Sequence, residues 1–269
     1  MSSKPFSLTA SLLASQVRGW RGSVAFKPAR TQPAKLLELY EFEASPFCRL
    51  VREVLTELDL DVMIYPCPQG GTRFRPKVQK LGGKQQYPFL VDPNTGRQLY
   101  ESADIIDYLG KTYGRRARNP KGWRRQANVI GSTAASALRF SGPFKALLKG
   151  QKGMLEHIRG LNANPSKAPA KPLELYSFES SPYSRPVRER MSELELPYIL
   201  RNFGKDKWAD MGPESVRVKL KAPVTGRNRK KMFELTGRTQ VPYLVDANTG
   251  VAMHESAKIL QHLDETYAA

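Results

Sequence analysis

The sequence has few cysteines and histidines and no long hydrophobic run. Only two cysteines, Cys48 and Cys67, and three histidines occur among 269 residues. Two cysteines are too few for a disulfide-stapled secreted scaffold, and no His/Cys cluster has the spacing of a structural zinc site. No stretch approaches the ~20 apolar residues that cross a bilayer. These absences exclude a membrane-spanning protein, predict no metal site and favour a reducing, cytoplasmic compartment, with organelle targeting left open.

Acidic residues are also scarce, and their scarcity is local. The chain carries 43 Lys and Arg against 25 Asp and Glu, a net charge of +18. Residues 1–35, the basic leader, contribute +6, and residues 114–172, the basic connector, contribute +12, so the rest of the chain is neutral. A solvated face explains this charge. Nucleic acid or an anionic surface is the alternative partner, which we disfavour because no nucleic-acid-binding motif accompanies the charge.

The neutral remainder consists of two copies of one unit. LELYEFEASPFCR at 37–49 matches LELYSFESSPYSR at 173–185, and YPFLVDPNTG at 87–96 matches VPYLVDANTG at 241–250. The offset between the copies grows from 136 to 154, which predicts an 18-residue insertion in the second copy, a surface loop near residues 206–230. A period this long indicates duplicated domains rather than a solenoid. We call residues 36–113 repeat 1 and residues 173–269 repeat 2.

The basic segments also echo each other. LLASQVRGW at 12–20 resembles TAASALRFS at 133–141, and each precedes a repeat. Taken alone, residues 1–35 look like a transit peptide, because they carry Ser, Lys and Arg but no acid. A sequence reused in mid-chain is no targeting signal, so we favour a structural role for the leader.

Each repeat predicts an α/β unit of order β-α-β-α-β-β-α. Alternating or apolar runs predict strands, helical spacing predicts helices, and Ser45-Pro46 is a favourable helix start. The helical crossover makes the first two strands parallel, and the DPNTG turn makes the last two an antiparallel hairpin. The expected elements of repeat 1 are a strand at 36–42, a helix at 46–60, a strand at 62–65, a helix at 77–81, strands at 89–91 and 98–100, and a helix from Ser102.

Three short motifs give this order a family resemblance. SPFC at 45–48 looks like the CPYC site of glutaredoxins with its first Cys replaced by Ser. Tyr87-Pro88 looks like a residue followed by a cis-proline, and Glu101-Ser102 looks like the pair that holds glutathione's γ-glutamyl end. The repeats thus resemble the thioredoxin-like fold in its glutaredoxin and glutathione S-transferase N-terminal form. The sequence resembles two such domains in tandem, without the all-helical C-terminal domain of a glutathione transferase.

The resemblance implies a glutathione site in each repeat, with no metal. Ser45 and Ser181 would stabilise the glutathione thiolate at a helix N-terminus, whose partial positive charge favours an anion. Glu101 and Glu255 would pair with the ligand's amino group. Cys48 stands at the second cysteine position of the motif. The remaining implied binding residues are Phe47, Lys84, Tyr87, Pro88, Ser102, Tyr183, Arg238, Val241, Pro242 and Ser256. The alternative for the serines is a helix cap alone, and for the prolines a trans bond at a strand start.

Redox chemistry is the weaker expectation. A dithiol mechanism needs a nucleophile where Ser45 stands, and serine forms no disulfide. Cys48 and Cys67 could form a redox pair, and the alternative is two small buried hydrophobes. The histidines make no catalytic constellation: we expect His157 and His262 to be solvated and His254 to lie on the hairpin strand.

The sequence therefore predicts a glutathione-binding protein with transferase-like or thiol-transferase-like activity. Glutathione would act as ligand or co-substrate, and its partner would be a small electrophile or a mixed disulfide. A homodimer is possible. The competing interpretation is a non-catalytic tandem module that binds or scaffolds other proteins.

Overall fold

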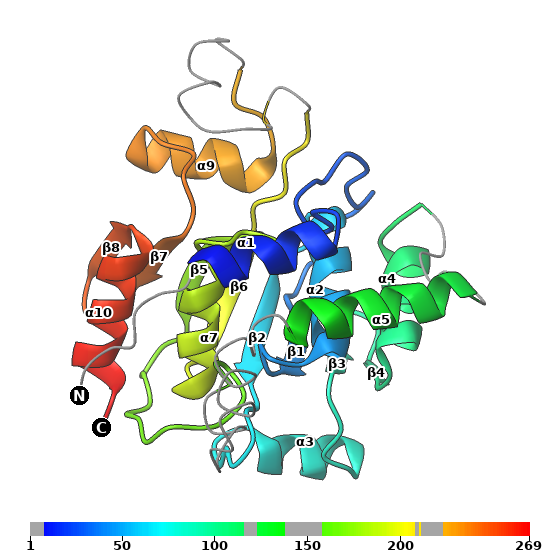
Figure 1. The fold of residues 1–269 in the computed structure, drawn as a ribbon, viewed down its shortest axis with the longest axis horizontal. Helices are drawn as coiled ribbons and strands as arrows, with labels where there is room; N and C mark the ends of the chain where they lie inside the picture. Colours follow the sequence, from blue (N-terminus) through cyan, green and yellow to red (C-terminus); the bar gives the residue numbers. More distant parts are fainter. Residues whose placement is uncertain (1–7, 116–122, 138–157, 208–209, 211–222) are drawn as a thin grey trace.

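The computed structural model describes residues 8–115, 123–137, 158–207, 210 and 223–269, and within these the two repeats have the same fold (Figure 1). The α/β architecture of tandem thioredoxin-like domains is confirmed. Repeat 1 comprises β1 (Leu37–Glu41), α2 (Pro46–Glu57), β2 (Val62–Pro66), α3 (Arg75–Gly82), β3 (Phe89–Asp92), β4 (Arg97–Leu99) and α4 (Ser102–Thr112). Repeat 2 comprises β5 (Leu173–Ser177), α7 (Arg185–Glu193), β6 (Tyr198–Asn202), α9 (Arg227–Thr236), β7 (Tyr243–Asp246), β8 (Val251–His254) and α10 (Ser256–Tyr267).

One sheet of eight strands runs through both repeats, in the order β4-β3-β1-β2-β6-β5-β7-β8. As predicted, β1 and β2 are parallel, as are β5 and β6, while each hairpin is antiparallel. The repeats meet where β2 pairs antiparallel with β6, Met63 opposite Ile199. The repeats thus pair within one chain, and each covers the strand edge that the other would expose to solvent.

The strand pattern explains which helices lie on which face. Leu37 and Leu39 of β1 point into a core shared with α2, α4, α7 and α10. Tyr40, the alternate residue, faces the other side and packs with Val78 of α3. Alternation of period two therefore divides the helices, leaving α3 and α9 on the second face. Ser45 caps α2 with Pro46 in its first turn, as predicted, because its hydroxyl accepts a hydrogen bond from the Cys48 amide.

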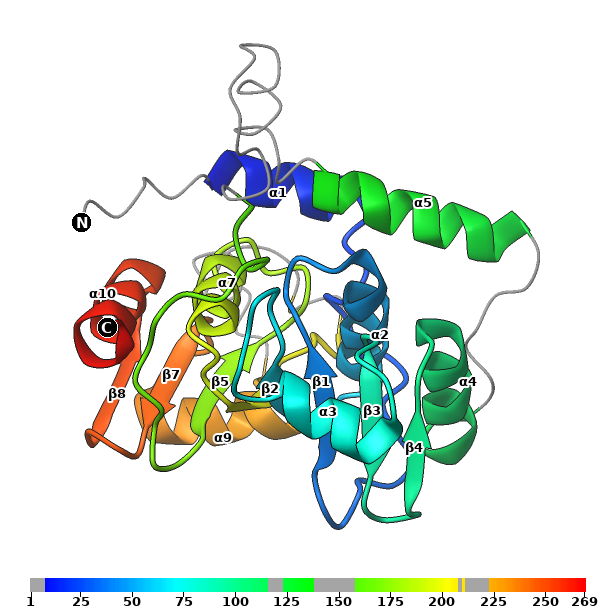
Figure 2. The same cartoon turned by 90° about the horizontal axis from the view of Figure 1, so that it is seen from below.

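The leader and the connector each contribute a helix to the folded structure. Helix α1 (Leu8–Val17) lies over α7, and α5 (Trp123–Ala137) lies over α2, both on one side of the molecule (Figure 2). Ala14 and Ala135, which match in the sequence echo, are both fully buried. The echo thus corresponds to two helices that pack on the sheet-covering helices.

The two segments cross between the repeats. The Ala25 amide donates to Lys205 of repeat 2, after which the chain returns and the Ala29 amide donates to Leu58 of repeat 1. In the connector, Ala163 pairs with Gln69 of repeat 1, and Lys167 then bonds Tyr267 of repeat 2. We call residues 11–25 the leader arm. Each segment thus bonds both repeats along its length, since Arg18 of the leader also donates to Glu53 of repeat 1 and the Gly160 amide of the connector donates to Glu193 of repeat 2.

The insertion lies between β6 and α9, and most of it, residues 208–209 and 211–222, falls outside the described residues, as does His157. The expectation that His262 is solvated was wrong. Its Nε2 lies 2.9 Å from Asp246 Oδ2, at the position where Tyr108 donates to Asp92 in repeat 1. Among the described residues, no helix has the length and apolar character to cross a membrane.

Candidate functional site

The two motif serines lie at equivalent turns and make equivalent hydrogen bonds. Ser45 Oγ accepts from the Cys48 amide and Ser181 Oγ accepts from the Ser184 amide, each at 3.2 Å. In repeat 2 the regular helix begins only at Arg185, so Ser181 lies ahead of the assigned first turn. The side chains are well covered, since Ser45 is 3% exposed and Ser181 1% exposed. Each hydroxyl therefore acts as a cap acceptor and retains its own proton for donation.

Both cysteines are free and buried. Burial raises the pKa of the Cys48 thiol to about 12, and burial likewise raises the pKa of Cys67 well above its usual range. Thiols of this kind stay protonated at neutral pH, and only the thiolate is a good nucleophile. The environment of Cys48 therefore favours packing over the catalytic role implied for it by its place in the motif.

The bonds before Pro88 and Pro242 are both cis, as the resemblance implied. Pro88 and Pro242 are buried, while Tyr87 and Val241 before them are half-buried. Glu101 and Glu255 are exposed and have left-handed backbone angles, φ 61° and φ 76°, directly ahead of α4 and α10. A positive φ is costly for a residue with a Cβ, and such residues cluster at ligand sites.

A glutamine that the sequence analysis did not single out holds each of these carboxylates. Gln86 Nε2 donates to Glu101, and Gln240 Nε2 donates to Glu255 Oε1 at 3.3 Å. Both glutamines lie two residues before the cis-prolines. Their presence at the same place in both repeats was the available signal.

The other implied binding residues are more scattered. Phe47 and Tyr183 are 45% and 51% exposed at the start of the helical turn. Lys84 Nζ lies 4.6 Å from the Tyr100 ring centroid, and Arg238 is exposed beside Thr236. Ser102 is buried at the first position of α4. Ser256 Oγ donates to the Tyr183 carbonyl at 2.8 Å, which joins two implied residues from opposite ends of repeat 2.

The repeats differ beneath the cis-proline. In repeat 1 Cys67 and Tyr87 contact each other, and the Arg75 guanidinium lies 4.9 Å from the Tyr87 ring centroid. In repeat 2 the matching residues are Phe203 and Val241, and Arg229 lies 5.3 Å from the Phe203 ring centroid. The aromatic side chain thus stands before the cis-proline in repeat 1, as Tyr87, and after the second strand in repeat 2, as Phe203. An arginine lies over the ring in both repeats.

A buried cluster of charges joins the repeats between α2 and α7. Arg52 Nε donates to Glu179 Oε2 at 2.8 Å, and Arg188 Nη2 donates to Glu43 Oε1 at 3.1 Å, so each arginine pairs across the seam. Arg52 also contacts Glu41. We call Glu41, Glu43, Arg52, Glu179 and Arg188 the seam cluster; all five are buried.

The pKa values within the seam cluster separate its glutamates. Burial is the main cause that raises the pKa of Glu41 to about 7; Arg52 and Arg188 oppose the rise, and repulsion from Glu43 and Glu179 adds to it. Arg52 and Arg188 outweigh the burial of Glu179 and hold its pKa well below the usual range. Glu41 thus has a raised pKa and Glu179 a lowered one, and repeat 2 has Ser177 in place of Glu41.

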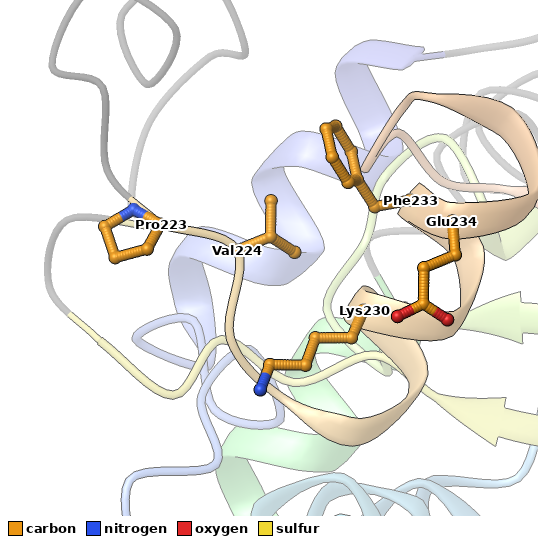
Figure 3. Close-up of a pocket in the computed structure, with 5 residues that line it drawn as sticks. All are labelled: Pro223, Val224, Lys230, Phe233 and Glu234. Carbon is orange, nitrogen blue, oxygen red and sulfur yellow. The ribbon is translucent and has the colours of Figure 1, made fainter.

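One hollow of the described surface lies between α9 and the chain just before it (Figure 3). It has a volume of about 500 Å³ and is lined by Pro223, Val224, Lys230, Phe233 and Glu234. None of these is an implied glutathione residue. Within the described ranges, no group of three or more His, Cys, Asp or Glu side chains is arranged to hold a metal ion.

Two thioredoxin-like domains, each with a hydroxyl at the turn before its first helix, a cis-proline and a glutamate of positive φ, define the class of the protein. The family model of the glutathione S-transferase N-terminal domain matches residues 39–118 and 175–269. The chain therefore belongs to this family.

Solved structures give a weaker likeness. The Bombyx mori glutathione transferase BmGSTD1 is 25% identical over 47% of this chain and 61% of its own, with a TM-score of 0.30. A Nilaparvata lugens delta-class glutathione transferase is 30% identical over 29% of this chain and 37% of its own, with a TM-score of 0.25. Leishmania TDR1, described as a unique trimeric glutathione transferase, is 15% identical over 88% of this chain and 68% of its own, with a TM-score of 0.31. This chain thus spans less than two thirds of the two insect enzymes. No curated protein sequence matches it.

Proposed function

We propose that the protein binds glutathione in each repeat and transfers its thiolate to a small electrophile. The observation that carries the proposal is the repeated set of Ser45, Pro88 and Glu101, matched by Ser181, Pro242 and Glu255. Family membership supports glutathione as the ligand. The two free cysteines are consistent with a reducing compartment such as the cytoplasm.

In this mechanism each residue has a distinct task. Glu101 and Glu255 would pair with the ligand's ammonium group, and the N-termini of α4 and α10 would favour its α-carboxylate. The backbone of Tyr87 and Val241 would bond the cysteinyl unit in the manner of an added strand. The Ser45 or Ser181 hydroxyl would donate to the sulfur and lower the pKa of the thiol.

The reaction would be a nucleophilic substitution. With an aromatic chloride as electrophile, the thiolate forms a carbon–sulfur bond, the carbon–chlorine bond breaks, and chloride leaves with the bonding pair. The thiol proton has already passed to solvent.

Calorimetry with glutathione tests the proposal. We expect two sites per chain, one after either Glu101→Ala or Glu255→Ala, and none after both. Glu265→Ala, an exposed glutamate of α10, is the matched control and should leave both sites unchanged. A full chain that binds no glutathione at millimolar concentration contradicts the proposal, and turnover of the aromatic chloride separates an enzyme from a binding protein.

A specific observation favours a second candidate, a non-catalytic tandem module. Both serine hydroxyls are covered and already serve as cap acceptors, and the Cys48 thiol is buried. This candidate predicts that Ser45→Ala and Ser181→Ala alter stability only. Loss of turnover in either variant, with glutathione binding retained, would contradict it.

A further inference from the structure

The leader arm bonds the turn that carries Ser181. Ser15 Oγ donates to the Ser180 carbonyl at 2.8 Å, and the Ser180 amide donates to the Gly22 carbonyl at 3.4 Å. The hydroxyls of Ser23 and Ser180 are in contact. Both backbone groups and the side chain of Ser180, immediately before Ser181, are thus engaged by the arm.

The arm also holds the start of α7. Arg185 Nη1 donates to the Ser11 carbonyl at 2.6 Å, and its Nη2 donates to Ser15 Oγ at 3.1 Å. Arg185 begins α7, four residues beyond Ser181. The serine is therefore flanked on both sides in sequence by residues bonded to the arm.

This cover coincides with the burial of the hydroxyl. Ser181 is 1% exposed, although Tyr183 in the same turn is 51% exposed. A ligand sulfur must come within about 3.5 Å of Oγ to accept its hydrogen bond, and a side chain this well covered offers little space for one. Access to Ser181 thus requires a change in what lies over it.

We propose that the leader arm is a lid whose opening admits glutathione to the Ser181 site. This inference rests on the proposed function for the identity of the ligand. The hydrogen bonds above hold the lid to repeat 2, and Arg18 holds it to repeat 1 through two hydrogen bonds to the buried Glu53, at 2.8 and 2.6 Å. Of the apolar side chains in residues 11–25 only Ala14 and Ala25 are buried, and Leu13 and Val17 on α1 are exposed. Segments with few buried apolar contacts open at low free energy. The lid is shut in this structure. If only a fraction of the molecules is open at any time, the apparent affinity for glutathione equals the intrinsic affinity multiplied by that fraction.

Gly22 offers a way to hold the lid open. It has φ +73°, and a Cβ there would lie 2.8 Å from the Glu179 Cβ and 3.2 Å from the Glu53 Cα. Gly19 is the matched control, because it also has a positive φ, +56°, but a Cβ there meets nothing within 4 Å. Both alanine variants share the backbone strain, and only Gly22→Ala unseats the arm.

The first experiment measures binding of S-methylglutathione, which has no free thiol, by calorimetry in an E101A background. We expect Gly22→Ala to bind at least about fivefold more tightly than Gly19→Ala. A lock provides the opposite test, because the contacting hydroxyls of Ser23 and Ser180 place two cysteines side by side. The oxidised S23C/S180C variant should lose at least about tenfold in affinity and regain it after reduction. Equal affinities across these variants overturn the lid.

A second experiment removes the dependence on glutathione. A Ser181→Cys reporter should react with a thiol reagent faster in Gly22→Ala than in Gly19→Ala, against the buried Cys48 and Cys67 as background. Equal rates overturn the lid whatever the ligand is. If labelling follows the lid but no variant binds S-methylglutathione, the proposed function fails and the lid itself stands.

Discussion

The two repeats show how one fold keeps its frame while its interior is exchanged. Repeat 1 places Cys67 against Tyr87, and repeat 2 places Phe203 against Val241, with an arginine over the ring in both. A small residue thus faces a large one in each repeat, but the order is reversed. Because the interior is close-packed, the pair must change together. The seam cluster differs in another way, since Glu41 of repeat 1 has Ser177 as its counterpart.

The largest effect should come from the seam cluster. Arg52 faces Glu41, Glu43 and Glu179, so Arg52→Met leaves Glu41 without its ion-pair partner, while Arg188 still pairs with Glu43 and Glu179 and Arg49 lies 3.8 Å from Glu179. We expect a loss of about 3–5 kcal/mol in urea denaturation. Arg188→Met should cost less, because Arg52 still pairs with both Glu43 and Glu179. Arg190, a partly exposed arginine of α7, provides the control variant Arg190→Met. Equal losses of stability in Arg52→Met and Arg188→Met would contradict the asymmetry.

Exchanging the packed pair tests the volume argument. Phe203→Cys copies repeat 1 and should cost about 2–4 kcal/mol, because it leaves a cavity under Arg229. Adding Val241→Tyr should recover part of this loss, since it restores the arrangement of Cys67 and Tyr87. A double-mutant cycle measures the coupling. Strictly additive losses would show that the two positions do not share one space.

The pH dependence should distinguish Glu41 from Ser177. The folded-state pKa of Glu41 is raised to about 7 from 4.5, so the folded state binds more protons than the unfolded state between these values. Its contribution to stability is therefore present below about pH 4.5 and is lost as the pH rises to about 7. Glu41→Ser, which copies repeat 2, should flatten this fall in denaturation curves from pH 4.5 to 8. The same slope in both proteins would contradict the assignment.

The smallest effect should be the same in both repeats. Ser45→Ala and Ser181→Ala each remove one cap acceptor at 3.2 Å and should each cost about 1 kcal/mol in urea denaturation. A much larger loss at Ser181 would show that the leader arm depends on its hydroxyl.

Local patterns predicted the fold well. Alternation in Leu37–Glu41, the Ser45-Pro46 helix start and the DPNTG turn are short-range signals, and the duplication presented each of them again in the second repeat. The seam cluster was missed because Arg52 and Arg188 lie on amphipathic helices, where a charge suggests solvent. Only tertiary contact between the repeats shows that these arginines are buried.

The sequence could predict which residues make up the candidate site, but not which other segment of the chain packs over it. The motifs named Ser181 as a candidate, but nothing in residues 11–25 shows that they bond the turn that carries it, since Ser15 and Ser180 are 165 residues apart. His262 was misjudged for a more local reason: its partner Asp246 lies 16 residues earlier, at the end of β7, and only the packing of α10 against the hairpin brings the two side chains together.

The crossing of the leader and connector has a consequence for the covalent chain. The leader bonds Lys205 of repeat 2, and the connector bonds Gln69 of repeat 1. The two halves of the molecule are also joined by the pairing of β2 with β6. A single proteolytic cut between residues 138 and 157 should therefore yield two fragments that stay together as a non-covalent heterodimer. We therefore expect the same complex to form when the two fragments are encoded by separate genes and expressed together.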